Sequence, residues 1–300
     1  MIYDVAFPNL GLFFEEVGSH VAVFSFDITF YGLIIALGMF VALDIIRKFA
    51  IHTKQKDDTY LDLFIYIIFF GIIGARIYYV LFNWQYYSKH LLEIVNLRAG
   101  GLAVYGGIFL GAAACYVYSK IEKLNTLLVF DTLCAAIPIA QGIGRWGNFF
   151  NKEAFGEYTN NLFAMRIKEI LVMEQNITPL MKENMVVDNG VNYIQAHPTF
   201  LYESAGCLLI GFILCKLFKK RKFDGQVLAT YCILYGILRA FIEGLRTDSL
   251  FIPFTSIRIS QVVSILLVIF GIFMYFYNIS HKNKCTSPYI ENIEEKTNSK

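Results

Sequence analysis

Long apolar runs alternate with short polar segments along most of the 300-residue chain. A helix needs about 20 consecutive, mostly apolar residues to cross a bilayer. Seven runs come near this length, at about 28–46, 60–82, 100–118, 127–143, 200–218, 226–243 and 257–277. The pattern therefore predicts an all-α polytopic membrane protein with about seven transmembrane helices, four within residues 28–147 and three within residues 198–279.

Three segments contain no apolar run of that length. Residues 1–27 predict an N-terminal arm that lies outside the cytoplasm or in the membrane interface, and the mostly polar residues 148–197 predict a small extracytoplasmic head. Residues 280–300 combine high charge with low hydrophobicity, which predicts a disordered cytoplasmic tail. Composition agrees with a membrane protein, because only 17% of the residues are charged, against about 25% in soluble domains.

The basic residues predict which way the chain is inserted, because Lys and Arg are enriched in short cytoplasmic loops. They follow the first, third, fifth and seventh predicted spans, as Arg47 and Lys48, Lys120 and Lys123, Lys219–Lys222, and Lys282 and Lys284. The other loops contain fewer basic residues, and these are scattered. We therefore expect the N-terminus outside and the C-terminus in the cytoplasm.

The six cysteines give no sign of a cofactor site, because no pair has the spacing of metal ligands. Five of them lie inside apolar runs, so we expect buried, unreactive thiols and no disulfide. We also expect no metal, no organic cofactor and no nucleic-acid partner.

Polar residues end the fourth apolar run, in the segment Gly-Arg-Trp-Gly-Asn-Phe-Phe-Asn-Lys-Glu-Ala-Phe-Gly at 144–156. Arg145, Asn148 and Asn151 are three residues apart, so on a helix they would share roughly one face. The glycines of the segment allow backbones to approach closely. On these residues alone, a pocket for a phosphate or lipid headgroup and an ordinary polar helix end are equally good interpretations.

The sixth span contains a stripe of polar residues, formed by Tyr235, Arg239, Glu243 and, just beyond the span, Arg246. At about 100° per residue these positions fall close together on a helix. A charge within a span costs about 2.5–3.5 kcal/mol on insertion scales, so it usually has a partner or a function. An ion pair between Arg239 and Glu243 at i, i+4 explains one arginine only. Two arginines suit an anionic phosphate, and we favour that interpretation.

Glu203 lies about one turn inside the fifth span, after the His197-Pro198 pair. Pro198 fits near a helix N-terminus. The carboxyl group of Glu203 has three possible states: protonated, acting as a general base, or paired with Arg145 or Arg239. We favour the ion pair.

Taken together, these motifs resemble the prolipoprotein diacylglyceryl transferase family. Residues 144–156 match its signature Gly-Arg-x-Gly-Asn-Phe-x-Asn-x-Glu-x-x-Gly at every fixed position. Further similarities, in Tyr31-Gly32, Gly74-Ala75-Arg76, His197-Pro198 with Tyr202-Glu203, and the sixth span, extend over most of the chain. The resemblance implies an enzyme of the bacterial cytoplasmic membrane. It would transfer the diacylglyceryl group of phosphatidylglycerol to the lipobox cysteine thiol of a prolipoprotein signal peptide, form a thioether and release glycerol phosphate.

The resemblance also implies site residues. Catalytic roles are expected for Arg145, Arg239, Tyr105 and Glu203, and phosphatidylglycerol binding for Arg145, Asn148, Asn151, Glu153, Gly156, Tyr235, Arg239, Glu243 and Arg246. The family often has His at the position of Tyr105, where it is favoured as the base that activates the substrate thiol. Tyrosine, with an ordinary pKa of about 10, is a poor base near neutrality. A cluster of arginines can instead lower the pKa of the thiol without a dedicated base.

Two other classes of protein would account for part of the same pattern. A transporter or flippase for an anionic lipid or solute would use the same arginines for binding, but the sequence shows no internal repeat of the kind that transporters use. A purely structural scaffold would leave the polar residues of the fifth and sixth spans unexplained.

Overall fold

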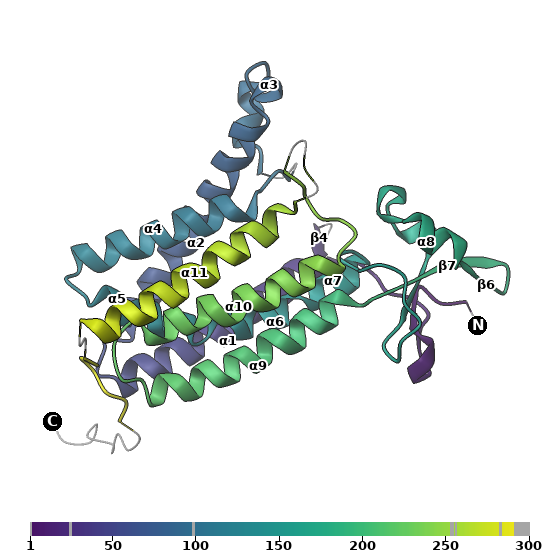
Figure 1. Cartoon of the computed structure of the whole chain (residues 1–300). Helices are drawn as coiled ribbons and strands as arrows, with labels where there is room; N and C mark the ends of the chain where they lie inside the picture. Colours follow the sequence, from purple (N-terminus) through teal and green to yellow (C-terminus); the bar gives the residue numbers. More distant parts are fainter. Residues whose placement is uncertain are drawn as a thin grey trace. The chain divides into compact units, whose positions relative to one another are not determined.

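The structure is a computed structural model, and it describes residues 2–23, 26–97, 100–252, 255, 257–281 and 284–290 (Figure 1). The chain divides into two compact units. The first unit contains residues 1–42 and 133–285, and the second contains residues 43–132 and 286–300. Helix α1 (Phe30–His52) passes from the first unit into the second, and helix α5 (Thr126–Cys134) leads back into the first.

The first unit is built on helices α6 (Ile137–Gly144), α7 (Trp146–Asn151), α9 (Thr199–Lys219), α10 (Gln226–Leu245) and α11 (Ile259–Ser280). Helix α10 packs against both α9 and α11, and α6 packs against α9 (Figure 1). The approach is close, because a Cβ atom on Gly236 would lie 2.8 Å from the Ser264 carbonyl oxygen. Membrane helices pack through small residues in this way, since lipid provides no hydrophobic driving force between them.

The second unit contains α2 (Asp58–Phe82) and α4 (Val104–Ile121), which also pack through glycines. A Cβ atom on Gly74 or on Gly106 would overlap the carbonyl oxygen of the other residue. The connection between these helices contains α3 (Trp84–Tyr87) and the 3₁₀ helix η2 (Leu91–Val95). The guanidinium of Arg76 fixes this connection, because it donates hydrogen bonds of 2.5–3.1 Å to the carbonyl oxygens of Glu93, Ile94, Asn96, Gly100 and Gly101.

Six helical segments are long and apolar enough to cross a membrane: 58–82, 104–121, 126–151, 199–219, 226–245 and 259–280. They match the second to seventh predicted spans. Over the first predicted span the chain forms α1, a helix of 23 residues.

Two predicted boundaries and one predicted continuous helix need correction. The first helix begins at Phe30 rather than at residue 28, because residues 26–29 form a strand. The third begins at Val104 rather than at residue 100, since Gly100 and Gly101 have φ angles of 79° and 75° that no right-handed helix contains. The fourth span is three short helices, α5, α6 and α7, with Pro138 in the first turn of α6.

The all-α prediction is wrong outside the spans, where the chain forms β-sheet. Strands β1 (Val5–Phe7), β2 (Leu12–Phe14), β5 (Met165–Lys168), β6 (Val186–Asp188) and β7 (Val191–Ala196) form an antiparallel sheet in the order β2-β1-β5-β7-β6. The register between β1 and β5 pairs Val5 with Ile167 and Ala6 with Arg166. The predicted N-terminal arm and the predicted head therefore share one sheet. Strands β3 (His20–Val23) and β4 (Phe26–Thr29) form a separate hairpin.

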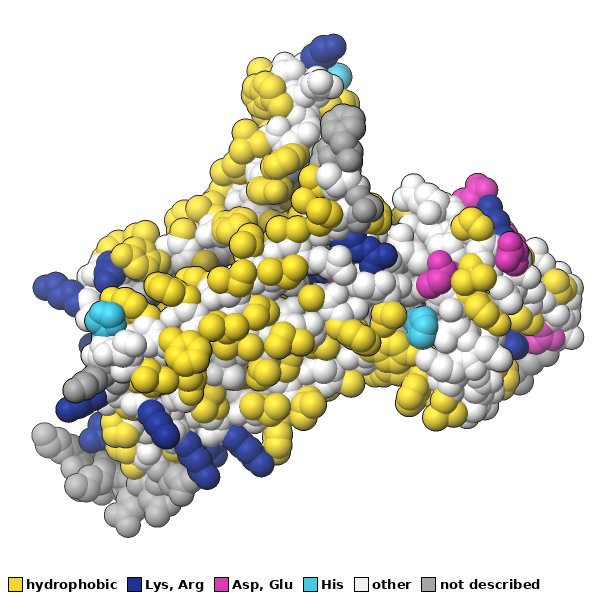
Figure 2. Space-filling view, viewed as in Figure 1, with side chains coloured by type: hydrophobic (Ala, Val, Ile, Leu, Met, Phe, Trp, Pro, Cys, Tyr) yellow, Lys and Arg dark blue, Asp and Glu magenta, His cyan; other side chains and the backbone are white. Residues whose placement is uncertain are grey.

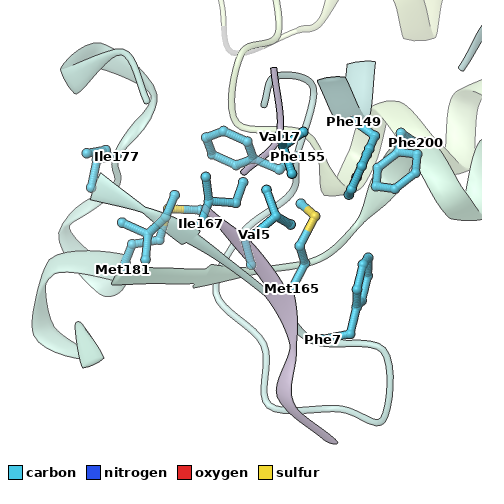
Figure 3. Close-up of a cluster of buried hydrophobic side chains, with 12 residues drawn as sticks. Val5, Phe7, Val17, Phe149, Phe155, Met165, Ile167, Ile177, Met181 and Phe200 are labelled. Atoms are coloured by element: carbon cyan, nitrogen blue, oxygen red, sulfur yellow. The ribbon is translucent and has the colours of Figure 1, made fainter. Parts of the chain in front are cut away.

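A hydrophobic cluster joins this sheet to the ends of two helices (Figure 3). Val5 and Ile167 come from neighbouring strands, and Met181 comes from the short helix α8 (Pro179–Glu183). Phe149 of α7 and Phe200 of α9 pack on each other, with ring centroids 5.6 Å apart. Because these two rings belong to the helices that contain the polar motifs, the sheet fixes the ends of those helices.

Residues 284–290 of the predicted tail lie within the described part of the chain. The Tyr289 ring stacks on His52 at a centroid distance of 4.7 Å, and the Ile290 amide donates to the His52 carbonyl oxygen at 2.9 Å. The remaining tail residues, 282–283 and 291–300, lie outside the described residues.

Charged side chains are unevenly distributed over the first unit. Figure 2 shows Lys and Arg side chains around the C-terminal end of α9, where the sequence has Lys216, Lys219 and Lys220. Asp and Glu side chains are seen mainly over the region of the five-stranded sheet (Figure 2).

Candidate active site

Four charged side chains form a chain of ion pairs within the first unit. Arg145, between α6 and α7, places Nη2 2.8 Å from Glu203 Oε1 of α9. Arg239 of α10 places Nη1 3.3 Å from Glu203 Oε2 and donates through Nη2 to Glu243 Oε2 at 2.6 Å. The prediction that Glu203 pairs with Arg145 or Arg239 is confirmed, and Glu203 pairs with both. The predicted i, i+4 pair of Arg239 and Glu243 is confirmed as well.

The carboxylates and the guanidinium groups of these ion pairs differ in burial. The Glu203 and Glu243 side chains are 2% and 3% exposed, whereas Arg145 and Arg239 are 24% and 18% exposed. The Arg145 contact lacks the angle of a hydrogen bond at Glu203 Oε1, so that attraction is mainly electrostatic. The carboxylates are thus internal supports, and the guanidinium groups are the part that a ligand can reach.

Tyr235 lies one helical turn before Arg239 on α10. Its ring stacks on Tyr231, with centroids 5.4 Å apart and an angle of 9° between the planes. The Tyr231 hydroxyl accepts a hydrogen bond of 3.0 Å from Gln141 Nε2. Tyr235, Arg239 and Glu243 therefore follow the predicted stripe along the helix.

Glu153 brings Asn148 and Asn151 together, since both amide groups donate to its Oε1, at 3.0 Å and 3.1 Å. The chain turns sharply here, with left-handed φ angles at Lys152 (52°) and Ala154 (56°). Residues without the freedom of glycine adopt this conformation at a cost of about 1–3 kcal/mol, commonly at functional sites. The asparagines thus orient Glu153, whereas the Arg145 side chain extends to Glu203.

Gly156 lies where three backbone segments cross. Its amide donates to the His197 carbonyl oxygen at 2.9 Å, and it forms a β-bridge with Arg246. A Cβ atom on Gly156 would lie 2.8 Å from the Leu245 carbonyl oxygen and 2.9 Å from His197 Cβ. Only glycine allows these segments to approach so closely.

The predicted helical stripe is wrong for Arg246. Helix α10 ends at Leu245, and Arg246 has extended backbone angles. Its guanidinium holds Asp248 in a two-pronged contact, with Nε donating to Oδ1 at 2.8 Å and Nη2 to Oδ2 at 2.6 Å. Burial raises the pKa of Asp248, but the hydrogen bonds from Arg246 and the positive charge of that guanidinium together outweigh burial and hold the pKa below its usual value.

Sequence reasoning missed Arg258 and Asp248. Arg258 precedes α11, and its Nη1 donates to the backbone carbonyl oxygen of Glu243. Their position in the sequence could have indicated them, because both charged residues lie in the short connection between α10 and α11, close to Arg246. Arg145, Arg239, Arg246 and Arg258 supply four positive charges, and Glu153, Glu203, Glu243 and Asp248 supply four negative ones.

The chain that forms this arrangement is similar in sequence to known proteins over most of its length. Residues 19–277 match the family model for prolipoprotein diacylglyceryl transferase. The chain belongs to the prolipoprotein diacylglyceryl transferase family. It is 43% identical over 254 residues to the phosphatidylglycerol–prolipoprotein diacylglyceryl transferase of Finegoldia magna, which covers 84% of this chain and 92% of that relative. For the enzyme of the same name from Clostridioides difficile the identity is 42% over 262 residues, with 87% and 95% covered. For that of Streptococcus uberis it is 39% over 249 residues, with 82% and 89% covered.

With its candidate spans, this member of the diacylglyceryl transferase family is a multi-pass membrane protein. Tyr105 is the second residue of α4 and belongs to the second unit, so its catalytic role in the transferase remains a prediction. The six cysteines are free, and four of them are buried. Across the described parts of the transferase, no group of three or more His, Cys, Asp or Glu side chains is placed to hold a metal ion.

Proposed function

We propose that this chain transfers the diacylglyceryl group of phosphatidylglycerol to the lipobox cysteine thiol of prolipoproteins. One observation supports this proposal above the others. Two buried carboxylates fix two arginines, Arg145 and Arg239, whose guanidinium groups remain partly exposed. Such groups recognise phosphate through paired N–H donors, and their supports keep them in place during the reaction.

The reaction needs stabilisation of negative charge on a departing phosphate. The thiolate attacks the glyceryl carbon that bears the phosphate ester, a C–S bond forms, and the C–O bond breaks with its electron pair on the phosphate oxygen. Arg145 and Arg239 stabilise the charge that develops on this oxygen. Because the thiolate is the nucleophile, positive charge nearby also favours the reactive form of the substrate.

The signature residues have supporting roles in this proposal. Asn148 and Asn151 orient Glu153 through Oε1, which leaves Oε2 to accept a hydrogen bond from a hydroxyl of the glycerol headgroup. Gly156 keeps the backbone of Arg246 close. Arg246 acts as a second clamp on the phosphate, and Tyr235 lines the same face of α10 as Arg239.

We also propose the membrane arrangement. The chain crosses the bacterial cytoplasmic membrane seven times, with α1 as the first span, and it places the five-stranded sheet outside and the C-terminus in the cytoplasm. The basic residues at the end of α9 and their scarcity over the sheet support this orientation (Figure 2).

A direct assay tests the function. Purified protein in detergent with phosphatidylglycerol is incubated with a signal peptide that contains the acceptor cysteine, and the peptide is weighed by mass spectrometry. We expect a gain of one diacylglyceryl group, absent when the cysteine is replaced by serine or the lipid by phosphatidylethanolamine. If folded protein leaves both peptide and lipid unchanged, transfer is refuted, and movement of the lipid across a vesicle membrane is measured instead.

A further inference from the structure

The proposed transfer needs a group that takes the proton of the substrate thiol, and this inference rests on that proposed function. At the position where the family often has a histidine, this chain has Tyr105 in the second unit. The first unit, which contains the arginines, has one histidine next to them in the fold. His197 lies two residues before α9, the helix that contains Glu203, and it is partly exposed.

The backbone places His197 beside the candidate site. The Gly156 amide donates to the His197 carbonyl oxygen at 2.9 Å, and the His197 amide donates to the Glu157 carbonyl oxygen at 3.0 Å. On its other side, Gly156 forms the β-bridge with Arg246. Neighbouring strands lie about 5 Å apart, so the Cα atoms of His197 and Arg246 are roughly 10 Å apart. Gly156 therefore keeps His197 and Arg246 on neighbouring backbone segments.

Tyr202 and Asn161 hold the imidazole of His197. The Tyr202 hydroxyl lies 3.3 Å from His197 Nδ1 and accepts a hydrogen bond of 3.1 Å from Asn161 Nδ2. Asn161 Oδ1 accepts from the Phe163 amide at 2.9 Å, which fixes the orientation of the Asn161 side chain. Asn161 Nδ2 is farther from His197 Nδ1, at 3.5 Å, so we assign its proton to Tyr202.

We propose that His197 is the base that accepts the thiol proton, with Tyr202 and Asn161 as positioning residues. Nδ1–H donates to the Tyr202 oxygen, and Nε2 is then free to accept. The S–H bond breaks as the proton moves to Nε2, the C–S bond forms, and glycerol phosphate leaves with the electron pair of the C–O bond. The imidazolium returns its proton to water or to the phosphate.

The ionisation of His197 agrees with this role. Burial lowers the pKa of His197, and the neighbouring Glu157 carboxylate only partly opposes this shift. Arg246 and its partner Asp248 lie across the β-bridge of Gly156. The imidazole is therefore neutral near pH 7, as a base must be.

A selenocysteine acceptor peptide tests the proposal, because a selenol is a stronger acid than a thiol and needs no base near neutrality. We expect His197→Gln to slow transfer to the cysteine peptide by about 10²–10⁴-fold. The same variant transfers to the selenocysteine peptide within a few-fold of the unmodified protein. The matched control is His20→Gln, which changes an exposed histidine of the same unit.

The outcomes separate the possibilities. Equal loss on both peptides means that His197 acts through folding or binding, and the base proposal fails. Full activity of His197→Gln on the cysteine peptide overturns it as well. If the unmodified protein transfers to neither peptide, the proposed function itself fails. Tyr202→Phe gives a second test, because it removes the hydroxyl that accepts from Nδ1–H and leaves His197 itself in place. We expect this variant to slow transfer to the cysteine peptide only.

Discussion

Replacing Glu203 by Gln tests the arrangement of the candidate site most directly. The substitution keeps the shape of the side chain and removes one buried negative charge. Glu203 is the shared partner of Arg145 and Arg239, at 2.8 Å and 3.3 Å. Arg145 then loses its carboxylate partner and Arg239 keeps only Glu243, although neither arginine is itself changed.

The magnitude follows from burial. With Glu203 2% exposed and both arginines less than a third exposed, solvent screens these pairs weakly. Removing one partner of a buried pair costs about 3–5 kcal/mol of folding stability. Loss of a pre-organised group that stabilises transition-state charge costs about 10²–10³-fold in rate. Because the arginines remain, we expect phosphatidylglycerol to bind with a similar KM while kcat falls.

The measurement combines steady-state transfer to the signal peptide with thermal unfolding in detergent. Glu203→Asp should restore part of the rate, and Glu174→Gln, at a side chain that is 90% exposed, should change neither quantity. The reasoning is refuted if Glu203→Gln has normal kcat, or if its loss lies entirely in KM.

Three further predictions concern the surroundings of the site. Gly156→Ala should cost about 1–3 kcal/mol of stability, because the added methyl meets a carbonyl oxygen at 2.8 Å; Gly18→Ala, with ordinary contacts of 3.7 Å, is the control in thermal unfolding. The pKa of Asp248 is lower in the folded protein than in the unfolded chain. The ionised Asp248 carboxylate therefore stabilises the fold fully above its unfolded pKa of about 3.9, and this stabilisation is lost as the pH falls through its folded pKa. Unfolding measured from pH 5 downward should therefore lose less stability in Asp248→Asn, and an unchanged pH dependence would contradict this. Arg76→Ala should free the connection between α2 and α4, which limited proteolysis detects as new cleavage there; an unchanged digestion pattern would count against it.

Local patterns predicted the helices and part of the site. Apolar runs near 20 residues located five of the six candidate spans to within four residues, whereas the fourth was predicted to end eight residues too early. The pair of Arg239 and Glu243 followed from its i, i+4 spacing, and the partners of Glu203 followed from the high cost of leaving a charge unpaired in a membrane.

Features that depend on distant pairing were not predictable. The pairing of β1 with β5 joins residues about 160 positions apart, and neither three- to four-residue strand has a pattern of its own. Likewise, extending the helical stripe to Arg246 failed because α10 ends one residue earlier. Its end depends on the crossing at Gly156, which no local signal reveals.

The pairing of β1 with β5 has a topological consequence. Two strands of one sheet lie on the same side of a membrane, so the chain between Phe7 and Met165 must cross it an even number of times. Between them, the segments 58–82, 104–121 and 126–151 account for three crossings. If all three cross, an even number requires a fourth crossing, and this supports the proposal that the 23-residue helix α1 is a span. With the three later spans, the total in the proposed arrangement is odd, in agreement with the proposal that the two ends of the chain lie on opposite faces. If the sheet lies outside, as proposed, it cannot close until β5 has been exported, because β1 pairs with a strand that is made more than 150 residues later.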